Sequence, residues 1–319
     1  MIFEYLFYNK LHMNYKIIGE NKVSRLILGC WRFGSLSVEE METLIRVSLE
    51  NGITMFDHAC TYERGKSEHI FGEVLKKYPD LRKQMYIQSK CGIVKDKILY
   101  YDFSKNNIIT CVKESIERLQ CGYLDYLLLH RPDTLMNPRE VAEALNYLYE
   151  EGLVHRFGVS NMVALQIENI QKYMKQKLII NQLQFNPVNT RILDETVFMN
   201  TPTSLSLSHS GYILEYMRLH DMTLQAWSIL QIDREEGCLI GHPKYSKLNT
   251  CLEHYAQKFK VSISAVIIAW ILYHPIEMQA IIGSRQPKRI KEACEFEKVI
   301  LSKMDWYQIY EAGIQRKLQ

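Results

Sequence analysis

Residues 53–75 read ITMFDHACTYERGKSEHIFGEVL and contain one strand-like run followed by one helix-like segment. The run 53–58 is short, apolar and nearly uninterrupted, as expected for a strand that is buried on both faces of a sheet. The segment 67–77 instead places its apolar residues at the spacing of one helix face, namely Ile70, Phe71, Val74 and Leu75. The stretch therefore predicts a strand, a polar turn and an amphipathic helix.

The same alternation continues along the whole chain. Strand-like runs are expected at 25–28, 53–58, 85–89, 123–129, 156–159, 178–184, 222–227 and 278–282. Helix-like segments are expected at 39–50, 67–77, 107–119, 139–150, 165–175, 213–220, 252–259, 264–273 and 288–296. Repeated strand–helix units imply a parallel sheet with right-handed crossovers. Eight of them predict an α/β fold with a single closed (β/α)8 TIM barrel.

An open, doubly wound sheet is the structural alternative. It is disfavoured for a dinucleotide enzyme because no G-x-G-x-x-G follows an early strand. Two long loops, 186–210 and 231–248, follow the sixth and seventh strands. In a barrel, such loops lie on the catalytic face, at the C-terminal ends of the strands. Ser37, followed by Val38-Glu39-Glu40, predicts a capping box at the start of one helix.

One domain is expected, with residues 1–14 as an N-terminal extension and residues 15–319 forming the barrel. The extension has no basic region or cleavage site, and it is shorter than the ~20 apolar residues that span a bilayer. Neither a signal peptide nor a membrane anchor is therefore expected. The sequence leaves open whether Met13 is the natural start.

The composition of the chain limits the partners and ligands that are expected. The net charge is only +3, from 39 basic and 36 acidic residues, and no basic run is interleaved with aromatic residues, so no nucleic-acid partner is expected. The eight cysteines form no C-x-x-C pair and are expected to be reduced, mostly buried thiols of a cytoplasmic protein. No Cys/His spacing indicates a metal site. The oligomeric state cannot be read from the sequence, and a monomer is the default.

Four polar residues lie at or just after the ends of three successive predicted strands: Asp57 and Tyr62, then Lys90, then His130. A tyrosine has an ordinary pKa of about 10, and a nearby ammonium group lowers it. A carboxylate would keep the lysine charged, and a histidine would orient a substrate oxygen. Together these groups can protonate a carbonyl oxygen while hydride reaches its carbon, and the reverse reaction oxidises an alcohol.

The segment beginning at Gly52 resembles the aldo-keto reductase signature G-[IV]-x-x-[FI]-D-x-A-x-x-Y-G, with matches at Gly52, Asp57, Ala59 and Tyr62. Further blocks resemble the same family, most closely its bacterial general aldo/keto reductases: QSKCG (88–92), LDYLLLHRPD (124–133), RFGVSN (156–161) and NQLQFNP (181–187). The resemblance implies NADPH-dependent reduction of small aldehydes, ketones or sugars. Tyr62 would be the general acid/base, Lys90 would lower its pKa, Asp57 would pair with Lys90, and His130 would orient the carbonyl.

The resemblance also implies cofactor contacts. Ser160, Asn161 and Gln182 match residues that bind the nicotinamide carboxamide, and Trp227 stands where the family stacks an aromatic ring on the nicotinamide. The block IIGSRQPKRIKEACE (281–295) resembles the site for the adenosine 2′-phosphate. The expected cofactor set is completed by Ser228, Gly283, Ser284, Arg285, Arg289 and Glu292, and Trp31 is expected to contact the substrate.

Departures from the family pattern qualify these expectations. Glu63 replaces the usual glycine after Tyr62, so the loop is expected to differ in shape. Gly283 and Ala293 replace a lysine and an asparagine found in some members, which leaves NADH use open beside NADPH. A non-enzymatic NADPH sensor and a Schiff-base aldolase using Lys90 are the alternative functions. The physiological substrate is beyond the sequence.

Overall fold

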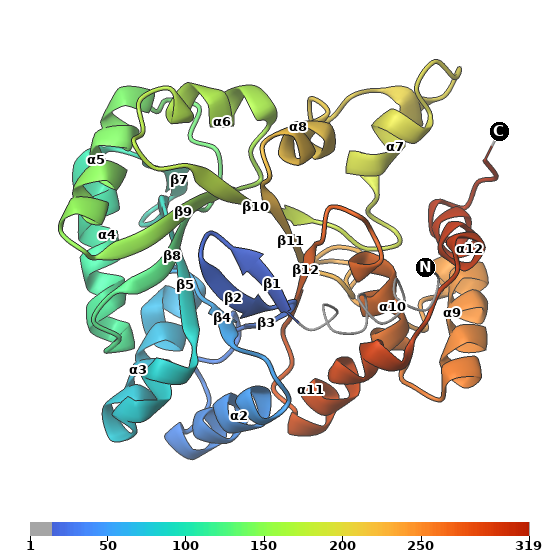
Figure 1. The fold of residues 1–319 in the computed structure, drawn as a ribbon, viewed down its shortest axis with the longest axis horizontal. Helices are drawn as coiled ribbons and strands as arrows, with labels where there is room; N and C mark the ends of the chain where they lie inside the picture. Colours follow the sequence, from blue (N-terminus) through green and yellow to red (C-terminus); the bar gives the residue numbers. More distant parts are fainter. Residues whose placement is uncertain (1–14, 319) are drawn as a thin grey trace.

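The computed structural model describes residues 15–318, and the centre of this part is a closed barrel of parallel strands (Figure 1). Each strand pairs with the next along the chain, and the last returns to the first through Ile281 opposite Ile27. The predicted (β/α)8 barrel is confirmed, and every predicted run overlaps a strand of the barrel. The barrel strands are β3 (Leu26–Gly29), β4 (Met55–Asp57), β5 (Tyr86–Cys91), β8 (Leu124–Leu129), β9 (Val154–Ser160), β10 (Leu178–Gln184), β11 (Thr223–Trp227) and β12 (Gln279–Ile282).

Helices cover the outside of the barrel. Those that match predicted segments are α2 (Val38–Glu50), α3 (Lys66–Lys77), α4 (Lys105–Leu119), α5 (Pro138–Glu150), α6 (Ala164–Gln171), α8 (Ile213–Leu219), α9 (Ser246–Phe259), α10 (Ile263–Leu272) and α11 (Pro287–Cys294). The capping box at Ser37 is confirmed, since its hydroxyl accepts from Glu40 N at 3.1 Å and the Glu40 carboxylate accepts from Ser37 N at 2.7 Å. A capping box is formed by residues close together in the chain and was therefore visible in the sequence.

Two helices were not predicted, α7 (Arg191–Val197) and α12 (Lys303–Ile314). Tertiary contacts fix α12: Trp270 Nε1 donates to Trp306 O and Trp306 Nε1 donates to Trp270 O, each at 3.0 Å. The two indole rings stack with centroids 5.0 Å apart. Such a reciprocal pair, 36 residues apart in the chain, leaves no local periodic signal.

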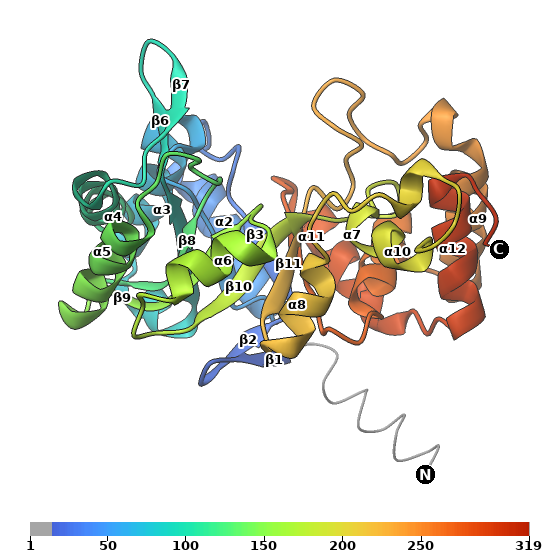
Figure 2. The ribbon, with the colours of Figure 1, turned by 90° about the horizontal axis from the view of Figure 1, so that it is seen from above.

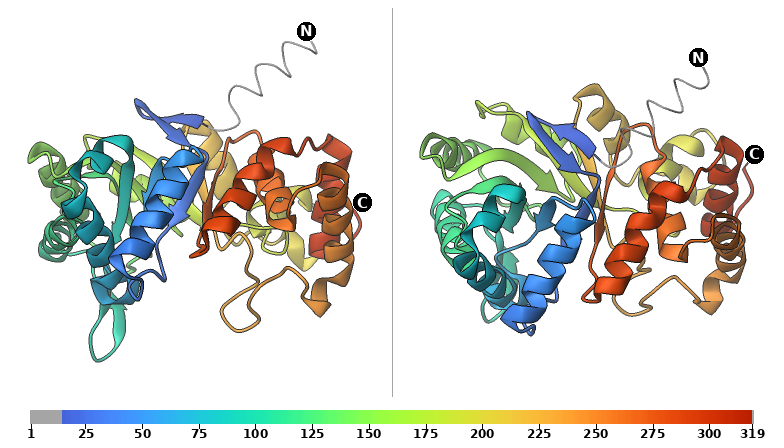
Figure 3. Two further views of the ribbon diagram at one scale, coloured as in Figure 1. Left: turned by 90° about the horizontal axis from the view of Figure 1, so that it is seen from below. Right: turned by 60° about the horizontal axis from the view of Figure 1, so that its bottom comes forward.

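Two β-hairpins, also not predicted, lie at opposite ends of the barrel (Figure 3). The hairpin of β1 (Tyr15–Ile18) and β2 (Asn21–Ser24) closes the N-terminal end, where Tyr126 Oη donates to Ile18 O at 3.2 Å. Ile18 and Val23 are buried there with interior residues of the barrel. The hairpin of β6 (Ile93–Lys95) and β7 (Leu99–Tyr101) projects from the other end.

The two long loops follow β10 and β11 as predicted, and the second projects on the same side as the β6–β7 hairpin (Figure 2). The first loop is not purely irregular, because it contains α7. In α7 the buried Glu195 carboxylate accepts from Ser208 Oγ, His209 N and Ser210 N at 2.9–3.2 Å. One buried side chain thus organises this polar segment. The loops are tied together by Asn186, whose amide donates to Ser228 O and Gln231 O.

Candidate active site

The four side chains predicted to carry chemistry lie together at the C-terminal end of the barrel. Asp57 ends β4, Lys90 lies in β5, Tyr62 begins the 3-10 turn η1 (Tyr62–Gly65), and His130 directly follows β8. Lys90 Nζ donates to Asp57 Oδ2 at 2.6 Å, to Tyr62 Oη at 2.8 Å and to His58 O at 2.9 Å. The rings of Tyr62 and His130 meet edge to face with centroids 5.9 Å apart. The strand-end residues are therefore brought into one constellation.

Lys90 is a charged side chain with almost no access to water, being 1% exposed. Burial lowers its pKa, but the Asp57 carboxylate and the Tyr62 hydroxyl raise it by more, so its pKa lies above the ordinary value. The pair with Asp57 thus keeps the ammonium charged, as the sequence predicted. Because water hardly reaches the Lys90 ammonium, its charge is stabilised by these protein groups alone.

Tyr62 keeps its proton at neutral pH. Burial raises its pKa to about 12, and the opposing effect of Lys90 is smaller. The predicted lowering by Lys90 is therefore present, but the expectation that the pKa would fall is wrong because desolvation of the phenolate outweighs it. Burial, followed by the charges of Lys90 and Arg131, lowers the pKa of His130 well below its usual value. His130 is therefore a neutral imidazole beside a protonated phenol.

A chain of buried amides holds the other oxygen of Asp57. Gln88 Nε2 donates to Asp57 Oδ1 at 2.5 Å, and Gln182 Nε2 donates to the same atom at 3.0 Å. Both amides also donate to Gln225 Oε1, whose own amide group donates to Gln88 Oε1 and, at 2.9 Å, to Gln279 Oε1. Gln279 Nε2 then donates to the main chain at Ser24 O.

Gln88, Gln225 and Gln279 were not predicted as part of the site. All three are fully buried in the barrel interior. Burial of an amide is costly unless its groups are hydrogen-bonded, and the chain of amides satisfies this condition. A usable signal was present: each is a long polar side chain in a strand whose other residues include buried apolar ones. The position of Asp57 is thus fixed from both sides, by Lys90 and by the amides.

The loop beside Tyr62 has an uncommon backbone. Glu63 and Arg64 have φ of 48° and 57°, in the left-handed region, and Gly65 follows with φ of 83°. The Glu63 carboxylate accepts from Gly34 N at 2.6 Å and from Ser67 Oγ at 2.9 Å. Glu63 therefore adopts a conformation that glycine would enter without strain, and its side chain links the loop after β4 to the loop after β3.

A model of the aldo/keto reductase family matches residues 25–314 of this chain. The chain belongs to the aldo/keto reductase family. It is 33% identical over 300 residues to oxidoreductase YdhF of Escherichia coli, a match that covers 91% of this chain and 94% of that protein. It is 28% identical over 307 residues to a 6-dehydroglucose reductase of Agrobacterium fabrum, with 93% and 96% covered. An aldo-keto reductase of Klebsiella pneumoniae crystallised with NADPH shares the fold, with a TM-score of 0.72 at 19% identity over 93% of each chain.

The residues that the aldo/keto reductase resemblance assigned to the nicotinamide lie side by side on β9, β10 and β11, with Asn161 directly after β9. Asn161, with φ of 60°, donates through its amide to Ser160 Oγ at 2.8 Å and to His130 O at 3.3 Å. Trp227 Nε1 donates to Asn161 Oδ1 at 3.2 Å. Ser160 Oγ donates to Gln182 O at 2.8 Å. This group therefore borders His130, although the amide nitrogen of Gln182 is already engaged by Asp57.

The residues assigned to the adenosine 2′-phosphate lie around the start of α11, and Ser228 lies directly after β11. The hydroxyl of Ser284 accepts from Gln286 N at 3.1 Å, and Arg285 Nη1 donates to Ser35 Oγ at 3.2 Å. Arg289 is exposed on the first turn of α11, and Glu292 lies 3.8 Å from Lys288 Nζ. Gly283 is exposed between β12 and this helix. The structure therefore groups Gly283, Ser284, Arg285, Arg289 and Glu292 in one segment, next to the loop after β3.

His58 does not share the chemistry of its neighbour Asp57. Its ring is fully buried, packs edge to face on Phe71 at 4.6 Å, and neither nitrogen has a hydrogen-bond partner among the described residues. Burial, with a smaller effect of Lys90, lowers its pKa to about 3. His58 is thus a neutral packing residue.

Three further features of residues 15–318 concern metal ligation, membrane-spanning helices and the cysteines. No group of three or more His, Cys, Asp or Glu residues in this part is placed to hold a metal ion. None of its helices is by itself long and apolar enough to cross a membrane. Cys30, Cys91 and Cys121 are buried, four cysteines are half-buried and Cys238 is exposed, so the expectation that most are buried holds only in part. Burial raises the pKa of Cys91, which makes its thiol a poor nucleophile.

Proposed function

We propose that this chain is an NADPH-dependent reductase of small aldehydes, ketones or sugars, with Tyr62 as general acid. One observation carries the proposal: the buried Lys90 ammonium lies 2.8 Å from Tyr62 Oη and 2.6 Å from Asp57 Oδ2, while His130 faces the same phenol. A carbonyl oxygen placed between Tyr62 and His130 would receive hydrogen bonds from both. The same arrangement works in reverse for alcohol oxidation.

The protonation states suit reduction. Tyr62 has a pKa of about 12 and so carries its proton at neutral pH, ready for transfer to the developing alkoxide. Lys90 stays charged and stabilises the tyrosinate that remains after transfer. His130 is neutral, so its ring nitrogen can donate a hydrogen bond that orients the carbonyl without competing as an acid. The amide chain and Lys90 keep Asp57 from moving during these steps.

The donor set fits a phosphorylated nicotinamide dinucleotide. Ser160, Asn161 and the oxygen of Gln182 would hold the nicotinamide carboxamide, and Trp227 would stack on its ring. Ser284 and Arg289 would hold the 2′-phosphate, since a guanidinium and a helix N-terminus both favour that anion. Arg289 has no ion pair or hydrogen bond through its side chain within residues 15–318, which leaves it available. NADPH supplies the hydride when bound, and NADH remains the weaker alternative.

The alternatives are disfavoured by the same geometry. A Schiff-base aldolase needs a neutral lysine, whereas Lys90 is held as a cation by Asp57. A pure sensor has no use for the aligned Tyr62, Lys90 and His130. Of the relatives compared above, one is a 6-dehydroglucose reductase, which supports a carbonyl substrate without fixing its identity. A monomer in the cytoplasm, without nucleic-acid or membrane partners, stays a prediction.

The test is NADPH oxidation by the purified protein with a panel of small aldehydes, ketones and sugars. Tyr62→Phe is compared with the wild type, and Tyr149→Phe, an exposed tyrosine on α5, is the matched control. Turnover lost only in Tyr62→Phe, with NADPH binding retained, would support the proposal. Binding without turnover on any carbonyl favours the sensor, and trapping of Lys90 by borohydride with a carbonyl compound favours the aldolase.

A further inference from the structure

Three arginines lie around the entrance of the active site, on three different loops. Arg131 directly follows His130, and its Cζ lies 5.4 Å from the centroid of the Trp227 ring. Arg234, in the loop after β11, lies 5.7 Å from the ring of Trp31, and Arg32 lies 4.3 Å from the same ring. Trp31 is expected to contact the substrate and Trp227 to stack on the nicotinamide. Each of these indole rings therefore has at least one guanidinium group packed against it.

Apart from these indole rings, the three guanidinium groups have no polar partner among residues 15–318: none donates a hydrogen bond there, and none has a carboxylate oxygen within 4 Å. Other arginines of this chain differ. Arg82, for example, lies 2.9 Å from Asp125, and Arg118 lies 2.8 Å from Glu68. The cations at the entrance are therefore not part of the ion pairs that hold the fold together.

The acidic residues nearest in sequence to Arg234 do not neutralise it. Asp233 accepts from the backbone N–H groups of Glu235 and Glu236. Glu236 pairs with Lys244 at 2.7 Å. Glu235 is exposed and forms no ion pair with Arg234 within the described chain. The Arg234 guanidinium is therefore not ion-paired with the acidic residues of its own loop.

Arg131 is the most confined of the three. It is partly buried, and burial lowers the pKa of its guanidinium, while Tyr101 raises it, Arg234 lowers it and Tyr62 raises it. It thus lies near the catalytic phenol and is repelled by a second cation. A desolvated cation beside another cation is unfavourable unless an anion joins them.

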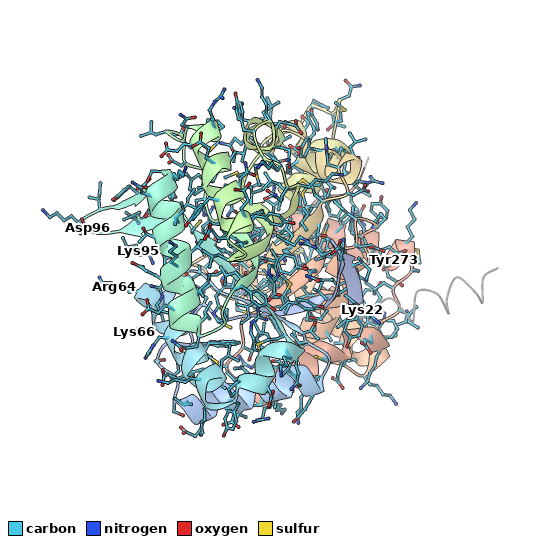
Figure 4. All side chains as sticks on the ribbon, turned by 60° about the vertical axis from the view of Figure 1, so that its left-hand side comes forward. Lys22, Arg64, Lys66, Lys95, Asp96 and Tyr273 are labelled. Carbon is cyan, nitrogen blue, oxygen red and sulfur yellow. The ribbon has the colours of Figure 1, made fainter. Side chains whose placement is uncertain are left out.

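The β6–β7 hairpin contributes further groups that act on Arg131 and His130. Tyr101 belongs to β7 and acts on Arg131, and Lys95 of β6 is among the cations that act on His130. Figure 4 shows Lys95 and Asp96 on the projecting hairpin, on the same side as Arg64 and Lys66 and away from Lys22 and Tyr273. The chain as a whole carries only +3, and Asp96 stands beside Lys95, so the cationic character of the entrance within residues 15–318 comes from Arg32, Arg131 and Arg234. A positively charged entrance attracts anionic substrates.

We propose that the substrate carries an anionic oxygen group, a carboxylate or a phosphate, which Arg131 and Arg234 bind while the carbonyl faces Tyr62 and His130. This inference rests on the proposed reductase function and narrows it to acidic carbonyl compounds. Guanidinium groups suit both anions because their parallel N–H groups match two oxygens. Trp31 and Trp227 hold the arginines in place by packing against them.

The experiment compares kcat/KM for 4-oxobutanoate with that for its uncharged methyl ester, in the wild type and in Arg131→Gln. The expected result is an acid-to-ester preference in the wild type that falls about 10- to 100-fold in Arg131→Gln, as expected for loss of a charge-assisted hydrogen bond. Arg131→Lys should recover part of the preference. Arg139→Gln is the control, since Arg139 lies 4.8 Å from the ring of Tyr173 on the barrel exterior. Glyceraldehyde 3-phosphate and glyceraldehyde form a second pair, which distinguishes phosphate from carboxylate.

Binding of succinate to the NADP+ complex provides a second readout that needs no turnover. Weaker succinate binding in Arg131→Gln, with NADPH affinity unchanged, supports the proposal. An acid-to-ester preference that is equal in the wild type and Arg131→Gln overturns it. So does a loss confined to NADPH affinity, which would assign the arginines to the cofactor's phosphates instead. If no carbonyl compound of the panel is reduced, the proposed function fails, while succinate binding still decides the anion site.

Discussion

Removal of the Lys90 side chain should destabilise the protein much more than removal of an exposed lysine. Lys90 Nζ makes three hydrogen bonds of 2.6–2.9 Å, and without it the buried Asp57 carboxylate keeps only amide donors. Breaking a buried ion pair from one side costs about 3–5 kcal/mol, because it leaves one charge uncompensated. We therefore expect Lys90→Met to lower the free energy of unfolding by about 4 kcal/mol.

The assay is urea unfolding without cofactor at pH 7, analysed at constant m-value. Lys95→Met, an exposed lysine on β6, is the control and should change stability by less than about 0.5 kcal/mol. The double variant Asp57→Leu/Lys90→Met removes both charges and should recover about 2–4 kcal/mol relative to the sum of the single variants. A cost below about 1 kcal/mol for Lys90→Met, or strict additivity of the two variants, would refute the reasoning that the pair is buried and interdependent.

Three further outcomes follow from the same geometry. Because the pKa of Tyr62 is about 12, kcat/KM for alcohol oxidation should rise about tenfold per pH unit from pH 8 to 10 while carbonyl reduction stays flat; a plateau of oxidation below pH 9 would contradict this. His58 has its pKa lowered from 6.5 to about 3, so its contribution to stability is complete above pH 6.5 and is lost as the pH falls toward 3. His58→Phe should therefore remove up to about 5 kcal/mol of the acid sensitivity seen in urea titrations at several pH values. Gln88→Leu removes the 2.5 Å donor to Asp57 and should lower kcat about tenfold with KM for NADPH unchanged; an equal loss in the exposed Gln84→Leu would show that the effect is not local.

Much of the fold was readable because its signals are local. The barrel strands appear as short apolar runs, and most helices appear as apolar positions at helical spacing with a capping residue such as Ser37. The hairpins and α12 were not readable in the same way. Their positions depend on contacts between distant residues, such as Tyr126 with Ile18 and Trp270 with Trp306. Local propensity carries no record of such partners.

The candidate site shows the same difference between features that follow from local sequence and features that depend on distant contacts. The sequence by itself determined which residues stand at the strand ends, and because parallel strands of a barrel share one C-terminal face, it also predicted that Asp57, Tyr62, Lys90 and His130 would meet. Only the tertiary structure decided the pKa of Tyr62, because desolvation depends on what surrounds the phenol. It alone also joined Gln88 to Gln225, which lie 137 positions apart in the chain, and left Arg131 and Arg234 near each other without a carboxylate. Burial and charge pairing are properties of the folded surroundings, and no stretch of sequence contains them.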